Sequence, residues 1–200
     1  MDHLVFATPY LRDTVHEVGR LLGVHPVEGG RHVGLGTRNH LLGLGGRRYL
    51  EIVGPDEDQP DPESPRPFGI DTLTAPRLIT WAVEPPDLDE AIARARDVGY
   101  DPGPAVPMSR RTPAGDLLEW RLTLPHEGTH DGVVPFLIDW GTTPHPSGTL
   151  PEVKLAAFHA GHPDPDAVLS DLAALGAELE VRQADAPVLV ATFAGGQTLS

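Results

Sequence analysis

A single carboxylate stands out in the apolar hexapeptide Tyr49–Gly54, which has the composition of a β-strand. Alternation places Glu51 on one face with Tyr49 and Val53, while Leu50 and Ile52 point to the other face. A carboxylate on a half-buried surface is costly unless it is paired, protonated or bound to a cation. Glu51 is therefore a candidate catalytic base and a candidate metal ligand.

The natural partner of Glu51 is His3, which lies in a second apolar strand at the start of the chain. His3 shares its strand face with Val5 and Ala7, so its imidazole should also point toward an apolar interior. The alternative for both residues is ordinary: Glu51 lies at a wet strand edge and His3 is an N-terminal surface residue. The sequence pattern leaves both alternatives open, since ionisable side chains are rarely fully buried.

Composition limits the classes of protein that this chain can be. Its 200 residues are 40% hydrophobic, enough for one domain of ordinary size or two small halves. The formal net charge of −14 argues against nucleic acid and against an anionic membrane surface as general partners. The chain has no cysteine, no signal-peptide pattern and no apolar run of membrane-spanning length. We therefore expect a cytoplasmic protein.

One pattern occurs three times along the chain: an apolar strand, an amphipathic helix and then short strand candidates. Three glycines, each suited to end a helix in the left-handed conformation, stand at intervals of 76 and 77 residues: Gly23, Gly99 and Gly176. Such a period indicates internal duplication. The pattern predicts an α+β protein of tandem βαβββ units at residues 1–55 and 77–150, with a shorter third βαβββ-like unit at 151–200.

The sequence also predicts the character of the segments between these elements. Residues 56–76 are acidic and rich in proline, which predicts an exposed linker with little regular structure. A polar loop is expected at residues 126–134. The second strand of the first unit is expected near residues 32–36.

Local motifs on this repeat are similar to those of the vicinal oxygen chelate superfamily. They are Asp2-His3-Leu4-Val5, Gly34-Leu35-Gly36-Thr37-Arg38-Asn39, Tyr49-Leu50-Glu51-Ile52, Ser109-Arg110-Arg111, Trp120-Arg121-Leu122 and Pro135-Phe136-Leu137-Ile138-Asp139-Trp140. Residues 2–145 resemble in particular the glyoxalase-like branch, which includes the fold of glyoxalase I, bleomycin resistance proteins and extradiol dioxygenases. The resemblance implies that paired βαβββ units form an incomplete barrel around a cleft.

The same resemblance implies one divalent metal held by residues on the first and last strands of each unit. His3 and Glu51 fill both places in the first unit, and Asp139 stands near the expected place in the second. The first strand of the second unit offers Thr80 and Trp81 where a second His or Gln is expected. An oxygen-rich set of this kind suits Mn²⁺, Fe²⁺ or Mg²⁺ better than closed tetrahedral Zn²⁺, although Zn²⁺ stays among the candidates.

Five further residues, together with Asn39, are candidates for substrate binding. In so acidic a chain, Arg110 and Arg121 could anchor a carboxylate or phosphate; alternatively they pair with acidic neighbours. Trp81, Trp120 and Trp140 could form an aromatic wall; alternatively they are core residues. Asn39 begins a strand and could orient a ligand.

Two classes of function follow from the resemblance. The first is a metal-dependent lyase, isomerase or dioxygenase that acts on a small polar or anionic molecule. The second is a protein that binds and sequesters a small molecule without chemistry, as antibiotic-binding members of the superfamily do. In both cases the expected partner is a small molecule, and a homodimer is among the expected assemblies.

Overall fold

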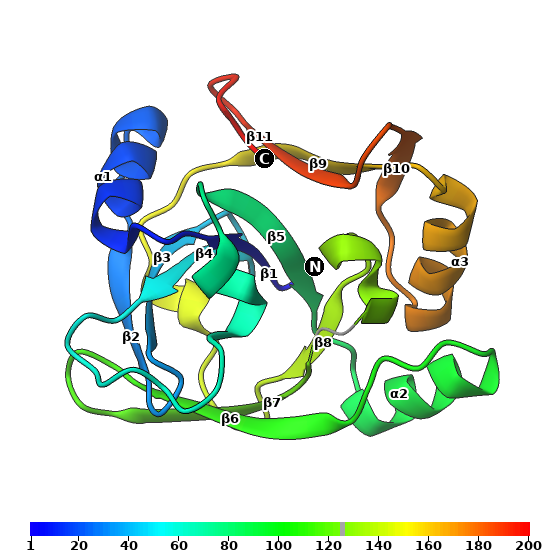
Figure 1. Cartoon of the computed structure of the whole chain (residues 1–200), viewed down its shortest axis with the longest axis horizontal. Helices are drawn as coiled ribbons and strands as arrows, with labels where there is room; N and C mark the ends of the chain where they lie inside the picture. The colour runs from blue at the N-terminus through cyan, green and yellow to red at the C-terminus, as the bar shows by residue number, and fades with distance from the viewer. Residues whose placement is uncertain (125–126) are drawn as a thin grey trace.

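The computed structural model describes residues 1–124 and 127–200 (Figure 1). The first unit comprises β1 (His3–Ala7), α1 (Leu11–Leu22), β2 (Val27–His32), β3 (Thr37–Gly43) and β4 (Tyr49–Pro55). A 3₁₀ helix, η1 (Pro67–Thr72), precedes the second unit: β5 (Arg77–Val83), α2 (Leu88–Asp97), β6 (Ala105–Arg111), β7 (Leu117–Thr123), η2 (Glu127–Gly132) and β8 (Phe136–Asp139). After η3 (Pro146–Thr149) the third unit has β9 (Leu155–His162), α3 (Pro165–Leu175), β10 (Glu180–Gln183), β11 (Val188–Phe193) and β12 (Thr198–Leu199).

The first two units form one barrel with the strand order β1-β4-β3-β2-β6-β7-β8-β5. Within each unit the first strand pairs in parallel with the fourth, and the fourth, third and second follow in that order. The tandem βαβββ prediction is therefore confirmed. The expected incomplete barrel is closed in its strand order, but β2 and β6 are joined through one residue pair, Arg31 with Arg111.

Helix ends follow the sequence signals. Asp87 accepts a hydrogen bond from the Glu90 backbone N–H at the start of α2, and Asp164 accepts one from Ala167 N–H at the start of α3. Gly23 and Gly176 end α1 and α3 in the left-handed conformation, with φ of 71° and 67°. No helix in the described part of the chain is long and apolar enough to cross a membrane.

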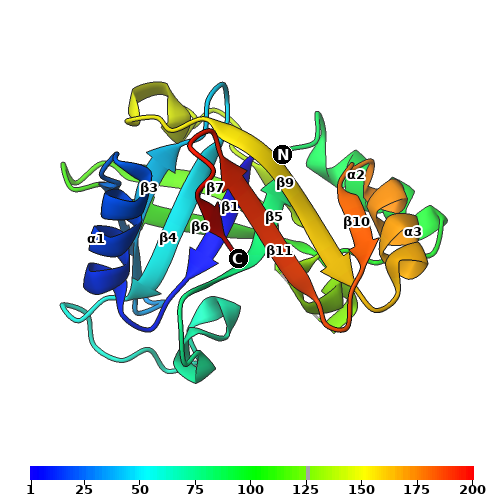
Figure 2. The same cartoon turned by 90° about the horizontal axis from the view of Figure 1, so that it is seen from above.

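The third unit has the βαβββ element order but a different sheet. Its strand order is β10-β9-β11-β12, so the first strand lies between the second and the third and pairs in parallel with the second. In the barrel units the first strand pairs with the fourth instead. Figure 2 shows β9 and β11 lying across the outside of the barrel, with α3 beside α2 at one end.

Two hydrophobic clusters result from strand alternation. Leu4 and Phe6 of β1 point outward, into a cluster that joins the barrel's outer face, its helices and the third unit. Val5 and Ala7 point inward, into a second cluster inside the barrel. Because both faces of β1 and β4 are covered, their side chains are buried almost without exception, and the inward face of β4 carries Tyr49 and Glu51.

Three segments differ from their expected form. The stretch at 56–76 is largely exposed, but Ile70 is buried and η1 packs against the barrel interior, because an apolar group follows its acidic first half. The strand expected at 32–36 lies earlier, at Val27–His32, since Gly34 and Gly36 adopt left-handed turn conformations. Residue 126 of the expected polar loop at 126–134 lies outside the described residues, whereas Val133 and Val134 are buried in the core.

Candidate functional site

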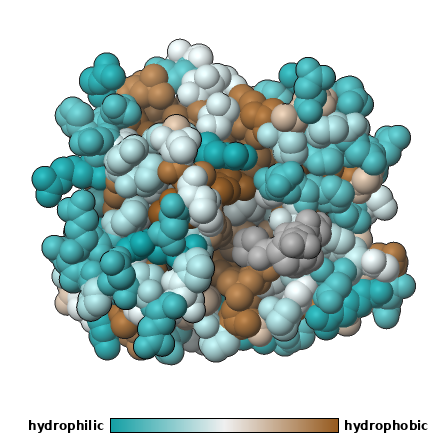
Figure 3. Space-filling view, in the orientation of Figure 1, coloured by the Kyte–Doolittle hydropathy of each residue, from teal (hydrophilic) through white to brown (hydrophobic). Residues whose placement is uncertain are grey.

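A cavity of about 210 Å³ lies inside the barrel, open at one end. Figure 3 shows hydrophobic residues gathered toward the middle of the face that the barrel presents in Figure 1, with hydrophilic residues around them. Side chains from β1, β2, β3, β4, β6, β7 and β8, from η1 and from three positions just outside these elements line the cavity. They are His3, His32, Leu35, Asn39, Tyr49, Glu51, Pro67, Phe68, Met108, Arg110, Trp120, Leu122, Leu124, Phe136, Ile138 and Trp140.

Three polar side chains form a hydrogen-bonded row on one wall. Arg110 Nη1 donates to Asn39 Oδ1 at 3.0 Å, and Asn39 Nδ2 donates to Glu51 Oε1 at 2.6 Å. The arginine fixes the amide oxygen and the carboxylate fixes the amide nitrogen, so the orientation of Asn39 is determined at both ends. Asn39 thus lies between a cation and an anion in this wall of the cavity.

His3 and Glu51 meet in the cavity, as the sequence predicts. His3 Nε2 lies 3.7 Å from Glu51 Oε2, beyond hydrogen-bonding distance. The ring of His3 stacks on Tyr49 with centroids 4.6 Å apart, and its Nδ1 contacts the carboxylate of Asp2. Both side chains line the cavity, so a ligand atom beside the pair can contact the imidazole and the carboxylate together.

The Arg110 guanidinium is buried, with 4% of the residue exposed. Burial lowers the pKa of Arg110 from its usual value, against the opposing influence of Tyr49 and Glu51. Within residues 1–124 and 127–200, no carboxylate lies within ion-pair distance of Arg110. A buried cation without a direct counter-ion is costly, so this wall is prepared for an anionic group.

His32 is the second imidazole of the cavity. Its Nδ1 lies 3.0 Å from Thr37 Oγ1, and its Nε2 lies 3.4 Å from Asn39 Nδ2, a donor. Burial lowers the pKa of His32, with a smaller raising effect from Glu51 and a lowering effect from Arg110. Neutral His32 therefore accepts from Asn39 through Nε2 and donates through Nδ1.

The opposite wall is aromatic. Trp120 and Trp140 contact each other with ring centroids 5.3 Å apart, and Phe136 lies edge-on to His3 at 5.5 Å. Phe68 of η1 covers this wall from the opening, 6.3 Å from Phe136. The wall is suited to a flat apolar group.

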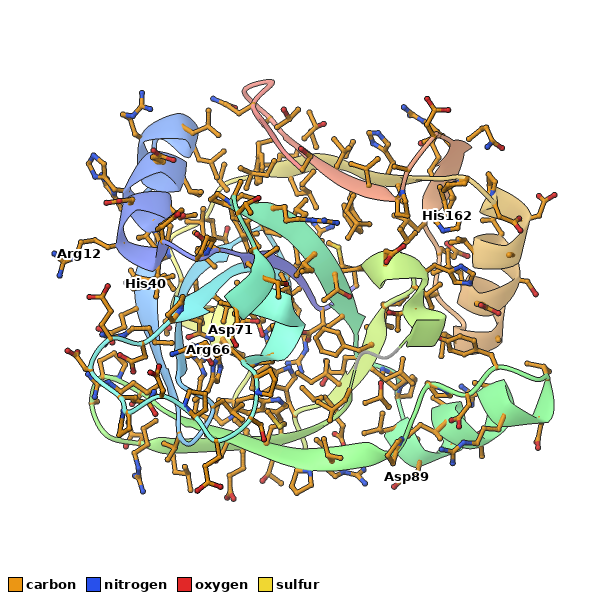
Figure 4. The ribbon with its side chains drawn as sticks, viewed as in Figure 1. Arg12, His40, Arg66, Asp71, Asp89 and His162 are labelled. Atoms are coloured by element: carbon orange, nitrogen blue, oxygen red, sulfur yellow. The ribbon has the colours of Figure 1, made fainter. Side chains whose placement is uncertain are left out.

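The cover formed by η1 is fastened by Arg66. Its guanidinium donates to Asp71 Oδ1 at 2.7 Å, to Asp61 Oδ1 at 2.7 Å and to the Gly36 carbonyl at 3.0 Å. Figure 4 shows Arg66 and Asp71 side by side on the segment before β5. These contacts tie η1, and with it Phe68, to the turn between β2 and β3.

Three residues that the sequence analysis selected lie elsewhere. The Trp81 indole points outward, donates to the Val133 carbonyl at 2.8 Å and packs against Phe158. Arg121 is on the outer face of β7, where it pairs with Asp89 and Asp139. Asp139 likewise faces away from the cavity, because alternation on β8 turns Phe136 and Ile138 inward.

The expected metal ligands therefore do not converge. Asp139 is on the outside of the barrel, and the amide of Asn39 occupies Oε1 of Glu51. Among the residues that the structure describes, no group of three or more His, Cys, Asp or Glu side chains is arranged to hold a metal ion. His3, Glu51 and Asp139 do not fit as a divalent-metal site, and the functional argument below uses the chain's own groups.

Strand register explains why the second unit supplies no ligand. His3 pairs with Tyr49 in the first unit, and Ala82 pairs with Phe136 in the second. Tyr49 of β4 therefore corresponds to Phe136 of β8. Two residues further along each strand, Glu51 of the first unit corresponds to Ile138 of the second. The first unit thus provides the polar wall and the second the aromatic wall, with Arg110 as the polar contribution of the second.

Sequence reasoning missed several residues of the site. His32 and Tyr49 line it, and alternation could have indicated Tyr49 because it shares the face of Glu51. Gly29 makes room for the polar row: a Cβ there would stand 2.2 Å from Arg110 Nη1 and 2.3 Å from Asn39 Oδ1. Phe68 was missed because residues 56–76 were predicted to be an exposed linker from their acidic composition.

Comparison with known proteins agrees with this architecture. Residues 1–176 match the family model of the glyoxalase-like domain. The chain belongs to the glyoxalase-like domain family. A solved structure of a hypothetical protein from Staphylococcus aureus is similar, with a TM-score of 0.69 at 12% identity, covering 96% of this chain and 90% of that one. This likeness shows that the two chains share a fold over almost the whole length of this chain, including the third unit.

Two methylmalonyl-CoA epimerase structures are also similar to parts of this glyoxalase-like protein. One, in complex with methylmalonyl-CoA and NH4+, is 22% identical with a TM-score of 0.48 and covers 73% of this chain and 97% of that one. The other, from Mycobacterium tuberculosis, is 20% identical with a TM-score of 0.41 and covers 68% and 83%. No curated protein matches the chain.

Proposed function

We propose that this glyoxalase-like protein binds, inside its barrel, a small molecule with one anionic group and a flat apolar body. The observation that carries the proposal is Arg110, a buried guanidinium that lines the cavity and is held by the neutral oxygen of Asn39. A carboxylate or phosphate on the ligand would supply the negative partner that the cation lacks. The apolar body would lie against Trp120 and Trp140.

The activity that we propose for the bound molecule is proton transfer, as in a lyase or isomerase. His3 Nε2 and Glu51 Oε2 are 3.7 Å apart and both line the cavity, so a ligand atom beside the pair is within reach of either for proton transfer. Glu51 is the proposed base and acts through Oε2. The hydrogen bond from Asn39 to Oε1 holds the carboxylate in this orientation. The apolar surroundings keep water away and strengthen the interaction of both groups with a developing charge.

Sequestration without chemistry is the second candidate function. It is supported by the same aromatic wall, because a flat apolar surface holds a ligand whether or not a reaction follows. Exchange of a ligand C–H in D₂O, abolished by Glu51→Gln, would separate proton transfer from sequestration. The expected homodimer and cytoplasmic location remain predictions.

Titration with benzoate tests the proposal, because benzoate combines a carboxylate with a flat ring. Quenching of the fluorescence of the cavity tryptophans reports binding, and benzamide serves as the uncharged control ligand. Arg110→Ala should weaken benzoate binding by about 1.5–3 kcal/mol, the range of a hydrogen bond to a charged group. Benzamide binding should change little.

Arg121→Ala is the matched control variant, since Arg121 is a surface arginine paired with Asp89 and Asp139. It should bind benzoate as the wild type does. Equal benzoate affinity of the two variants, or no preference of the wild type for benzoate over benzamide, would contradict the proposal.

A further inference from the structure

The carboxylate of Asp2 lies directly behind the cavity, and 2% of the residue is exposed. Its two oxygens have three partners. Oδ1 contacts His3 Nδ1, while Oδ2 contacts Trp140 Nε1 at 3.2 Å and His145 Nε2 at 2.9 Å. Two of these partners, His3 and Trp140, are cavity residues on opposite walls.

The protonation state of this cluster follows from its contacts. Burial alone would raise the pKa of Asp2, but hydrogen bonds with His145 and His3 hold it well below its usual value. Trp140 Nε1 can only donate, which agrees with an ionised carboxylate that only accepts. His145 Nδ1 accepts from the Ser147 backbone N–H at 3.2 Å, so its Nε2 carries the proton and donates to Asp2.

The same reasoning fixes His3. Because ionised Asp2 can only accept, the proton of neutral His3 resides on Nδ1 and the lone pair on Nε2. That lone pair faces Oε2 of Glu51 across the gap of 3.7 Å. Backbone hydrogen bonds hold Asp2 in place, from its N–H to the Ala82 carbonyl at 2.8 Å and from Tyr49 N–H to its carbonyl at 3.3 Å.

We infer that Asp2 is a positioning residue that sets the tautomer of His3 and the orientation of the Trp140 indole with one carboxylate. The inference rests on the proposed function insofar as the Nε2 lone pair then accepts a hydrogen bond from the ligand beside Glu51, the proposed base. It links the two walls: the group that makes His3 an acceptor also holds the aromatic surface against which the ligand lies. His145 completes the cluster by donating to the same oxygen as Trp140.

Asp2→Asn gives a specific outcome, because the amide has one acceptor oxygen where the carboxylate has two. Two donors, Trp140 and His145, meet at Oδ2, so the amide oxygen should remain there and the NH₂ group should face His3 Nδ1. His3 would then have to accept through Nδ1 and carry its proton on Nε2. The cavity would meet an N–H in place of a lone pair, as happens when the carboxylate behind a catalytic imidazole is made an amide.

The test is ¹⁵N NMR of the histidine rings in the whole protein without ligand, at a pH where His3 is neutral. The His3 signals are assigned by comparison with His3→Gln. We expect the Nδ1–H tautomer in the wild type and the Nε2–H tautomer in Asp2→Asn. His145→Gln, which leaves the carboxylate in place, should retain the wild-type tautomer of His3.

The indole N–H signals provide a second measurement. The Trp140 signal should shift in Asp2→Asn because its acceptor loses its charge, whereas the Trp120 signal should stay in place. A wild-type His3 in the Nε2–H form, or an unchanged tautomer in Asp2→Asn, would overturn the inference. Should Asp2→Asn fail to fold, the wild-type tautomer alone decides.

The tautomer measurement uses no ligand, so its failure is distinguishable from that of the proposed function. Loss of benzoate selectivity with an Nδ1–H His3 would reject the binding proposal and leave the role of Asp2 intact. Retained benzoate binding with an Nε2–H His3 would reject the role of Asp2 and leave the binding proposal intact.

Discussion

At the scale of single residues, the site is a set of polar groups whose partners are specified one by one. Asn39 has a donor on one side and an acceptor on the other, and Asp2 accepts from three groups. These contacts fix the orientation of both side chains. Such a network has a defined charge state, and pH should act on it through particular groups.

His32 gives the clearest pH prediction. Because burial lowers its pKa in the folded protein, the unfolded chain binds the proton more readily. The contribution of neutral His32 to stability is therefore fully present above the unfolded pKa of about 6.5, and it is lost as the pH falls from there toward the folded pKa. His32→Gln removes this dependence.

Urea unfolding between pH 7.5 and pH 5 measures this effect. The wild type should lose stability more steeply than His32→Gln, by up to about 1.4 kcal/mol per pH unit for one proton. His40, whose pKa is also lowered by burial, is present in both proteins and cancels in the difference. Parallel pH profiles would show that His32 is not kept neutral by the fold.

The alternation of side chains along a strand also decides which candidate residues can face the cavity. On β7, Trp120 and Arg121 are neighbours, so they must point to opposite faces, and one of them had to lie outside the cavity. The structure turns Trp120 inward and pairs Arg121 with acids. The direction agrees with the sequence of β7, because Trp120 shares its face with Leu118 and Leu122 whereas Arg121 shares its face with Glu119 and Thr123.

At the scale of elements, the glycines of β2 shape the site by leaving space for side chains of the neighbouring strands. The register of β2 against β3 shifts between Glu28 and Gly30, which marks a β-bulge. Gly29 lies within this bulge and leaves space for Arg110 and Asn39. A strand rich in glycine has a weak sequence signal, which is why β2 was expected too late in the chain.

Gly29→Ala should displace the end of the Arg110 side chain and disturb Asn39, because the new methyl group would overlap both. We expect benzoate affinity to fall while the far-UV circular dichroism spectrum is retained, since the closest contact is a flexible guanidinium. Gly148→Ala is the control, as a Cβ at that position meets nothing within 4 Å. Unchanged benzoate affinity in Gly29→Ala would argue that Arg110 is not the anchor.

Helices and first strands were the elements that the sequence predicted best. Their caps and terminal glycines are local signals, and the period of the glycines disclosed the repeat. The sheet order of the third unit carries no such signal, because pairing β9 with β10 or with the last strand depends on contacts between distant segments. Composition likewise failed for η1, where Phe68 and Ile70 follow an acidic stretch.

At the scale of the whole molecule, the third unit and the barrel share one hydrophobic cluster. Leu4 and Leu50 on the outer barrel face belong to the same cluster as Leu189 and Phe193 of the third unit. The cavity tryptophans are on the other side of that wall. The barrel and the third unit should therefore unfold together.

Leu189→Ala tests this coupling. Removing a buried leucine should destabilise the protein by about 2–5 kcal/mol, and the loss should be seen by tryptophan fluorescence as well as by circular dichroism. Leu169→Ala, on the exposed side of α3, is the control and should change stability little. If Leu189→Ala shifts the unfolding transition seen by circular dichroism and leaves the transition seen by tryptophan fluorescence unchanged, the two parts unfold independently.

The central claim concerns the interior of the barrel: an anion binds at Arg110 and an apolar group lies on the aromatic wall. A crystal structure of the wild-type protein with benzoate tests it most directly. We predict the carboxylate within about 3 Å of the Arg110 guanidinium, the ring against Trp120, and the ligand within reach of His3 and Glu51. Benzoate bound elsewhere, or held in the barrel with its carboxylate directed toward solvent, would contradict the claim.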